Sequence, residues 1–160
     1  MIEIHTDGSF VFAPYYTGAW AYTIWEDDRF GRRMVAQSSG IGGGSSNECE
    51  AQAILCALAR LRVMGRADEQ VLLLTDSCSV KRLVEQGIVP PSEELARLVN
   101  DVRAAMRGFQ SIRMVGVKRY EVRDADRLAG ERTATYRHAA AEWMRAHRGI
   151  RGGREYVASR

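Results

Sequence analysis

Hydrophobic and polar residues alternate at the start of the chain. Residues 1–7 (MIEIHTD) place isoleucine and threonine at every second position, which is the period of a strand with one buried face. We expect this strand to end at Asp7 and the chain to turn at Gly8-Ser9, because glycine permits a turn or a close backbone approach. Residues 71–77 (VLLLTDS) form a second apolar run that stops at Thr-Asp. If the two strands are neighbours, about 4.8 Å apart, their terminal carboxylates point into the same space.

The pattern between these two runs predicts a meander. In order, it indicates a loop at residues 10–16, a strand at 18–25, a hairpin turn at Asp27-Asp28, a strand at 30–37 and a flexible loop at 40–46. Sequential strands with short connections favour antiparallel pairing.

Apolar residues then recur at three- and four-residue spacing, which predicts amphipathic helices. The expected helices cover residues 47–64, 77–86, 92–106 and 122–147, and the remaining strands cover 71–75 and 111–117. Glu50 shares a stripe with Ile54 and Leu61, and Asp126 heads a similar stripe on the last helix. The fold class is therefore α/β: a five-stranded mixed sheet, an antiparallel meander plus parallel strands, flanked by helices. Such sheets bind ligands at the carboxyl ends of their parallel strands.

Size and composition fit one soluble domain. The chain has 160 residues, of which 46% are hydrophobic and 27% charged, and we expect a single domain over residues 1–147 and a basic, flexible tail over 148–160. Apolar runs fall short of the roughly 20 residues of a membrane span, and we expect neither a secretory signal nor membrane association. Three cysteines without a CxxC pair favour reduced thiols in the cytoplasm and argue against zinc. A net charge of +3 permits a polyanionic partner.

Each of four acidic residues has either a local structural role or a role in a shared metal site. Taken alone, Asp7 suits a turn, and Asp76 suits the cap of the helix that follows it. Glu50, three residues after Asn47, suits a capping box and the helix dipole, and Asp126 suits the same roles at the last helix. If the four converge, their mutual repulsion raises their pKa values unless divalent cations bind. Oxygen ligands without cysteine or histidine suit Mg²⁺ first and Mn²⁺ next. Two such ions roughly 4 Å apart support in-line attack on a phosphodiester, which implies a nucleic-acid substrate.

Four short motifs, taken in order, resemble ribonuclease H of type 1. They are residues 6–9 (TDGS), 45–50 (SSNECE), 75–77 (TDS) and 125–129 (ADRLA), and the resemblance spans about residues 1–130. It implies a ribonuclease H-like fold and a metal-dependent endonuclease that cuts the RNA strand of an RNA-DNA hybrid, leaving a 5′-phosphate and a 3′-hydroxyl. The implied cofactors are two Mg²⁺ ions, with Mn²⁺ as a substitute, and the implied state is a monomer without an obligate protein partner.

The resemblance also implies the site residues. The catalytic and metal-binding residues it implies are Asp7, Glu50, Asp76 and Asp126, with Gly8 as a further metal contact, and the implied substrate-binding residues are Ser9, Ser45, Ser46, Asn47, Ser77 and Arg119. Ser46 and Asn47 fall where family members read the minor groove, and Ser45 falls where a phosphate is held. Small hydroxyl and amide groups can contact 2′-hydroxyls in a shallow minor groove. The alternative reading of this Ser-Gly loop is a plain connector.

The chain departs from the family in three places. Residues 118–124 (KRYEVRD) lack the histidine that many members carry before the last acid. The histidine-free archaeal pattern Arg-x-x-Asn-x-x-Ala-Asp is matched at Arg119 and Asp126, but Val122 replaces its asparagine. The segment from 87 to 111 lacks a Trp- and Lys-rich basic handle, so the 148–160 tail becomes a candidate for hybrid affinity.

Two other functions remain open from the sequence. One is a different nuclease on the same fold, such as a junction resolvase or an exonuclease. The other is a nucleic-acid-binding module that cleaves weakly, which the missing histidine and asparagine motivate. Structural or solvated roles are expected for His5, His138 and His147, and core positions for Trp20, Trp25 and Trp143.

Overall fold

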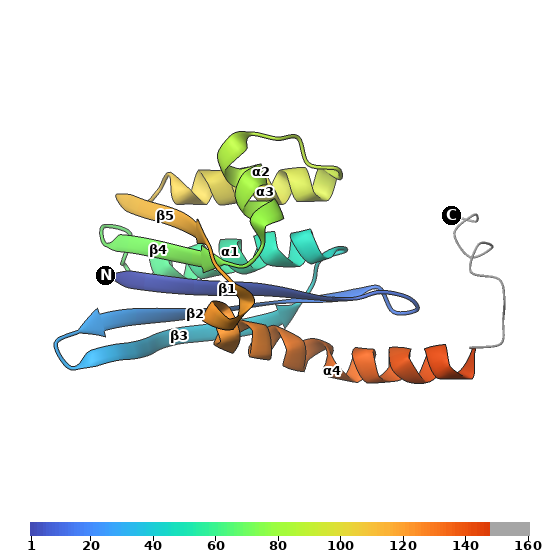
Figure 1. The fold of residues 1–160 in the computed structure, drawn as a ribbon. Helices are drawn as coiled ribbons and strands as arrows, with labels where there is room; N and C mark the ends of the chain where they lie inside the picture. The colour runs from blue at the N-terminus through green and yellow to red at the C-terminus, as the bar shows by residue number, and fades with distance from the viewer. Residues whose placement is uncertain (148–160) are drawn as a thin grey trace.

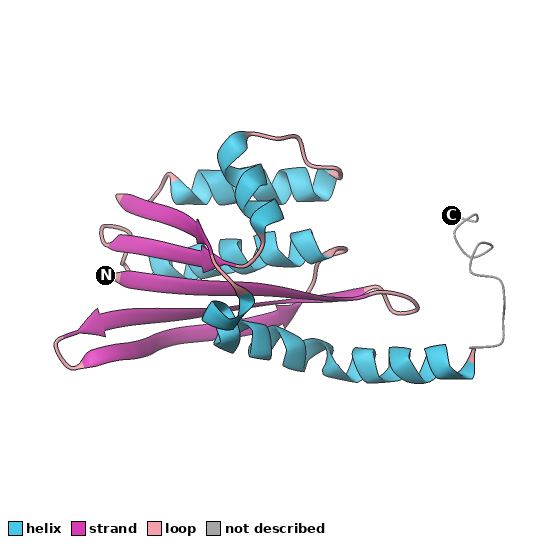
Figure 2. Ribbon diagram, viewed as in Figure 1, coloured by secondary structure: helices cyan, strands magenta, loops and turns pink. Residues whose placement is uncertain are grey.

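A five-stranded sheet with helices on both faces forms the core of the protein (Figures 1 and 2). The structure is a computed structural model and describes residues 1–147; the expected tail at 148–160 lies outside the described residues. The strands are β1 (Ile2–Val11), β2 (Thr17–Asp28), β3 (Gly31–Ile41), β4 (Gln70–Thr75) and β5 (Ser111–Gly116). Their spatial order is β3-β2-β1-β4-β5, which places β1 at the centre.

The sheet is mixed, as the sequence predicts. β1 pairs antiparallel with β2, and β2 pairs antiparallel with β3, which confirms the meander. β4 runs parallel to β1, and β5 runs parallel to β4. The parallel pairs need crossover connections, and helices supply them.

The helices predicted from the periodicity are confirmed, and their boundaries agree to within a few residues. They are α1 (Ser46–Val63), α2 (Cys78–Gln86), α3 (Glu93–Met106), the 3₁₀ turn η1 (Arg119–Val122) and α4 (Arg123–Ala146). α1 packs on β1 and β2 from one face of the sheet, and α3 packs on α1. α4 lies across β1, β2 and β3 on the opposite face. Ile54, Leu58 and Leu61 of α1 are completely buried in the main core with Ile4 and Leu73 of the sheet.

The predicted end of the first strand at Asp7 is wrong. β1 continues to Val11 because β2 pairs with it along its whole length, including Gly8 opposite Trp20. Gly8 and Ser9 are therefore strand residues rather than a turn. Asp7 lies inside the strand.

The predicted boundaries of the next hairpin also shift. The turn lies at residues 29–30, after the expected Asp27-Asp28, and the N–H of Phe30 donates to Asp28 Oδ1 at 2.7 Å. Gly31 follows with a φ of +118°, a conformation that favours glycine. β3 then takes in Gly40 and Ile41 from the expected loop, because β2 offers them partners.

The C-terminal half of α4 projects past the sheet (Figure 1). Trp143 lies on this half and is 39% exposed, so its expected core position is wrong. Its ring stacks on that of His147, with centroids 4.3 Å apart. Trp20 and Trp25 are partly buried instead. Sequence periodicity predicts an apolar helix face, but it does not reveal whether a sheet lies beneath that face.

The three cysteines are free thiols. Between residues 1 and 147, no helix is both long and apolar enough to cross a membrane.

Gly8 provides a test of how closely β1 approaches α1. A Cβ at this position would lie 2.6 Å from the Glu50 nitrogen and 2.8 Å from the Cys49 Cβ, closer than packed atoms come. We predict that Gly8→Ala lowers the free energy of unfolding in urea by about 1–3 kcal/mol, because the helix must move away from the strand.

Gly130 is the matched control. It lies within α4, and a Cβ there would meet no heavy atom within 4 Å. Gly130→Ala is expected to raise the free energy of unfolding by roughly 0.5–1 kcal/mol, because alanine is the better helix former. Equal losses at both glycines would contradict the close approach.

Candidate active site

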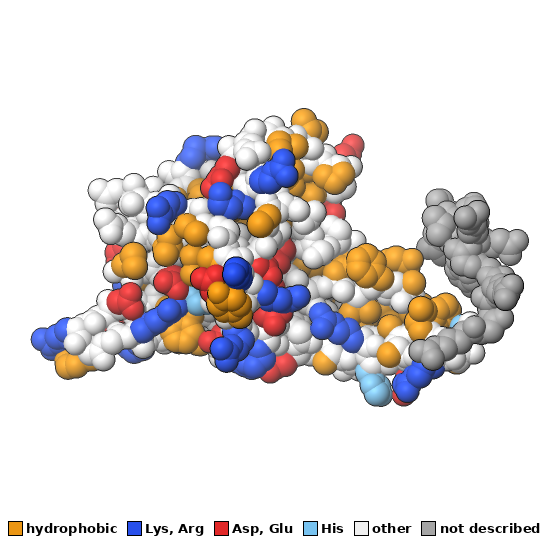
Figure 3. Space-filling model, viewed as in Figure 1, with side chains coloured by type: hydrophobic (Ala, Val, Ile, Leu, Met, Phe, Trp, Pro, Cys, Tyr) orange, Lys and Arg blue, Asp and Glu red, His pale blue; other side chains and the backbone are white. Residues whose placement is uncertain are grey.

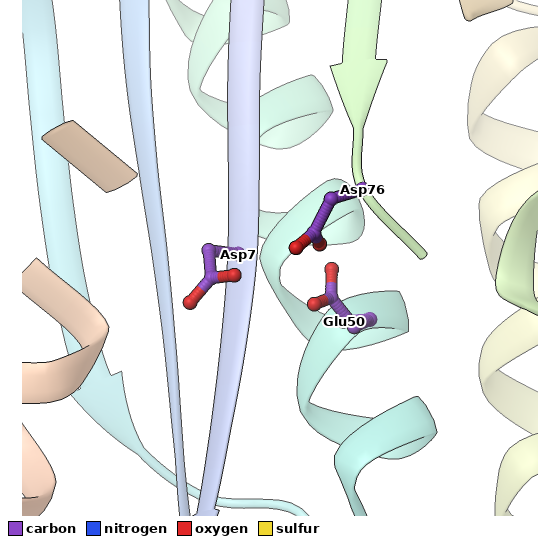
Figure 4. Close-up of side chains that lie close together, drawn as sticks. All are labelled: Asp7, Glu50 and Asp76. Carbon is purple, nitrogen blue, oxygen red and sulfur yellow. The ribbon is translucent and has the colours of Figure 1, made fainter. Parts of the chain in front are cut away.

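Three carboxylates meet where β4 ends beside β1. Asp7, Glu50 and Asp76 each place an oxygen within 4.8 Å of the others. Figure 4 shows them converging from β1, from the first turns of α1 and from the residue after β4. The pairing of Thr6 with Thr75 makes the two Thr-Asp sequences neighbours, which confirms the premise drawn from the sequence.

Glu50 enters this space through the gap left by the short β4. Pairing of β1 with β4 ends at Thr75, so the N–H of Gly8 lies past the end of β4. This N–H donates to Glu50 Oε1 at 2.9 Å, and Thr75 Oγ1 donates to Oε2 at 3.4 Å. Gly8 faces α1, and strand alternation then turns Asp7 toward α4. The end of β4 thus lets an acid from one face of the sheet meet an acid from the other.

Asp7 is the most constrained of the three acids. Its side chain is 1% exposed, and both of its buried oxygens lack a hydrogen-bond partner among the described residues. Burial, together with the charges of Asp76 and Asp126, raises the pKa of Asp7 to about 7, against the opposing charges of Arg119 and Arg137. A buried polar group without a partner is costly. A bound cation would remove that cost.

The two other acids share this electrostatic tension. Burial, with the charge of Asp7, raises the pKa of Glu50 well above its ordinary value, although the bond from Gly8 opposes the shift. Burial also raises the pKa of Asp76, with a further increase from Asp126 and an opposing effect from Arg119. The three acids therefore form one coupled cluster.

Asp126 lies beside this cluster but outside the group of three. It stands in the first turn of α4, where its Oδ1 lies 2.7 Å from both Nε and Nη2 of Arg119. Nη2 of Arg119 lies 3.9 Å from Asp7 Oδ1. The structure thus gathers three of the four predicted carboxylates directly and connects the fourth through Arg119.

Most of the structural readings of the four acids are wrong. The caps are Ser45 for α1 and Ser77 for α2, and α4 begins after Val122 with no side-chain cap among its described neighbours. The capping readings of Glu50, Asp76 and Asp126 are therefore wrong, although Asp126 does lie in the first turn of α4, where the helix dipole favours an acid. Asp7 lies within a strand, so its turn reading is wrong too.

A family model described as reverse transcriptase-like matches residues 5–132. The chain belongs to the reverse transcriptase-like family. Its structure is similar to that of RNase H1 from the archaeon Halobacterium salinarum, with 22% identity and a TM-score of 0.72 over 84% of this chain and 98% of that one. No curated protein matches the sequence significantly.

Two other solved structures are similar to this reverse transcriptase-like chain. The N-terminal RNase H domain of a Mycobacterium tuberculosis protein is 21% identical, with a TM-score of 0.74 over 87% of this chain and 97% of that one. LC11-RNase H1 from compost, in complex with an RNA/DNA hybrid, is 22% identical, with a TM-score of 0.69 over 82% and 95%. These similarities establish the ribonuclease H-like fold.

Four of the six predicted substrate-binding residues of this reverse transcriptase-like chain lie at the starts of helices. Ser46 is exposed and Asn47 is half-buried at the start of α1, and Asn47 lines an open hollow of about 280 Å³ together with Arg82. The hydroxyls of Ser45 and Ser77 instead accept the cap bonds of α1 and α2, each at 3.2 Å.

Ser9 has an internal role in the fold. It is 2% exposed, its Oγ lies 2.8 Å from Thr133 Oγ1, and Arg137 donates to the same oxygen. These bonds join β1 to α4. Contact between Ser9 and a substrate stays a prediction, as does the predicted metal contact of Gly8, whose N–H is directed at Glu50.

Sequence reasoning missed Glu48. This carboxylate is 8% exposed; it accepts the N–H of Gly44 at 2.7 Å and the hydroxyl of Ser92 at 3.1 Å. Ser92 also caps α3. Glu48 thus ties the loop before α1 to the start of α3. The spacing Ser45-x-x-Glu48 is that of a capping box and could have indicated this role. No pattern in the sequence, in contrast, indicates that Arg137 contacts Ser9.

Asp7 makes a pH dependence of stability testable. Its pKa of about 7 in the fold exceeds the ordinary 3.8, so between these pH values the folded protein holds a proton that the unfolded chain releases. The contribution of Asp7 to the free energy of unfolding is therefore fully present below about pH 4 and is lost as the pH rises through 7. We predict that Asp7→Asn melts higher than the wild type at pH 8 in EDTA and declines less from pH 5 to pH 8.

Asp68→Asn is the control for this experiment, because Asp68 is exposed. Its melting curve should follow that of the wild type at both pH values. A collapse of Asp7→Asn at pH 8 would instead give Asp7 a structural role.

Proposed function

We propose that this chain is a ribonuclease H, a metal-dependent endonuclease that hydrolyses the RNA strand of RNA-DNA hybrids and leaves a 5′-phosphate and a 3′-hydroxyl. One observation carries the proposal: Asp7, Glu50 and Asp76 converge at the end of β4, and the Asp7 oxygens are buried without a hydrogen-bond partner among the described residues. The ribonuclease H-like fold supports it. One similar structure, LC11-RNase H1, is described in complex with an RNA/DNA hybrid.

The donor set fits hard divalent cations. Every candidate ligand is a carboxylate oxygen, which Mg²⁺ and Mn²⁺ prefer, and the unpartnered Asp7 needs a positive charge beside it. We propose that Asp7, Glu50, Asp76 and Asp126 hold two Mg²⁺ ions, with Mn²⁺ as a substitute. Two ions bound in this way supply an activated water and stabilise the departing oxygen.

The protein positions these acids rigidly. Asp7 is fixed in the central strand of the sheet, and Glu50 is oriented by the N–H of Gly8 and the hydroxyl of Thr75. Preorganised groups of this kind need little rearrangement during reaction. Arg119 is mostly exposed beside the acids, where its guanidinium can reach a backbone phosphate of the substrate.

The start of α1 suits recognition of the RNA strand. Ser46 and Asn47 present a hydroxyl and an amide within four residues of Glu50 along the chain, and Arg82 lines the same hollow as Asn47. Such groups can bond to 2′-hydroxyls in the minor groove, which distinguishes RNA from DNA. Glu48 holds the preceding loop in place, so these side chains need little ordering on binding. The expected contacts of Ser9, Ser45 and Ser77 with substrate would require their present bonds to be shared.

A weakly cleaving binding module is the second candidate. Val122 replaces the asparagine of the archaeal pattern and is completely buried, so it presents no polar group to a substrate. A module of this kind would bind hybrid tightly without cutting it.

We predict that the purified protein cuts labelled RNA-DNA hybrid with Mg²⁺ or Mn²⁺ and that EDTA abolishes cleavage. Glu50→Gln should reduce the cleavage rate at least about a hundredfold, because a metal-binding charge is lost. Glu131→Gln, an exposed site paired with Arg127, is the control and should match the wild type. Equal cutting of double-stranded DNA would indicate another nuclease, and binding without cutting would indicate the module.

Asn47 provides a separate test of substrate recognition. We predict that Asn47→Ala raises KM for the hybrid by roughly two- to tenfold, the loss of one or two hydrogen bonds, and changes kcat less. Asn100→Ala on the exposed face of α3 is the control. An unchanged KM would favour the connector reading of the loop.

A further inference from the structure

Arg119 lies between two acids of the site. Its Nε and Nη2 are both 2.7 Å from Asp126 Oδ1, and Nη2 is 3.9 Å from Asp7 Oδ1. The hydrogen bond with Asp126, together with the charges of Asp7, Asp126 and Asp76, raises the pKa of Arg119 against the effect of partial burial. Its guanidinium therefore acts as a positive counter-charge for acids that otherwise repel one another.

The backbone around Arg119 is held firmly, whereas its side chain is not. Arg119 begins η1, where Glu121 Oε2 accepts the Lys118 N–H at 2.8 Å and Val122 is completely buried. The Arg119 side chain is nevertheless 60% exposed, in contrast to 1% for Asp7. The guanidinium can thus leave the acids by side-chain rotation, without unfolding of η1 or movement of Asp7.

Asp7 and Asp126 differ in how closely a positive charge approaches them. The nearest described cation to Asp7 is Arg119, at a distance beyond hydrogen bonding, and the Asp7 oxygens have no hydrogen-bond partner in the described chain. Asp126, in contrast, is bonded to two nitrogens of Arg119. A divalent cation shared by Asp7 and Asp126 would lie within a few ångströms of the guanidinium, where repulsion between like charges is strong.

We propose that Arg119 competes directly with a second divalent cation for the position between Asp7 and Asp126. The Asp7, Glu50 and Asp76 group takes one ion first, and a second ion binds only when Arg119 leaves Asp126. This inference rests on the proposed function, because it assumes that the acids bind metal.

The competition has a consequence for the substrate. Once it leaves Asp126, the guanidinium stays beside the site and is free to bond to a phosphate, for which its geometry is suited. Binding of the second ion and binding of a polyanion then favour the same position of Arg119. By linkage, each should strengthen the other.

Calorimetric titration with Mn²⁺ alone tests the competition in the full-length protein, stripped of metal beforehand. We expect Arg119→Gln to tighten the second binding event by about tenfold, the magnitude of one charge-assisted hydrogen bond, and to change the first event less. Arg119→Lys keeps the charge but loses the two-nitrogen contact. Its affinity for Mn²⁺ in the second binding event should therefore lie between those of the wild type and Arg119→Gln. Arg127→Gln is the control, because Arg127 also lies in the first turns of α4 and pairs with Glu131.

Thermal melting gives a second readout that needs no cleavage. In EDTA, Arg119→Gln should melt below the wild type, because it loses the counter-charge, and saturating Mn²⁺ should remove the difference. An unchanged or weaker second event in Arg119→Gln would overturn the proposal. If the second event is unchanged or weaker but the protein cleaves hybrid, the proposed function is kept and only the competition is rejected. Tighter Mn²⁺ binding by Arg119→Gln without any hybrid cleavage would reject the proposed cleavage activity but keep the metal binding and the competition.

Discussion

The rest of the structure depends on one buried carboxylate in the central strand. Asp7 is 1% exposed, has no hydrogen-bond partner within residues 1–147 and lies among other acids. Such a group destabilises a fold unless a positive charge can approach it. The surrounding elements do not relieve this cost with hydrogen bonds. They hold the acids together at the expense of stability, which agrees with the proposed role of this cluster in cation binding.

The meeting of the acids follows from the lengths of two adjacent strands. β1 runs on to Val11 while β4 stops at Thr75, and the sheet is open beside Gly8. Only a glycine allows α1 to come so close, since any Cβ would touch the helix backbone. Figure 4 shows the result: acids from both faces of the sheet point into one space. The same close approach that packs the core therefore also assembles the site.

Charged groups around this centre divide into fixed and movable ones. Glu48 is buried and holds the loop before α1, so the residues proposed to contact RNA are fixed in advance. Arg119 is anchored by its backbone but exposed at its side chain. Figure 3 shows Lys and Arg side chains beside Asp and Glu side chains on this face of the molecule. A surface of mixed charge agrees with the proposed function, in which this site would accept both cations and a polyanion.

The sequence by itself determined the order and type of the elements, because hydrophobic periodicity records which side of each strand or helix is buried. It also pointed to Asp7, Glu50 and Asp76 as candidates, since two Thr-Asp sequences after apolar runs and an acid on the buried stripe of a helix are local patterns, and the fold brings these three acids together. Only the tertiary structure decided that β1 continues past Asp7 and that Trp143 lies beyond the sheet, because both depend on which partner strand is present. The tertiary structure also decided that Arg119 pairs with Asp126. Contacts between side chains that face one another in space leave no periodic trace in the chain.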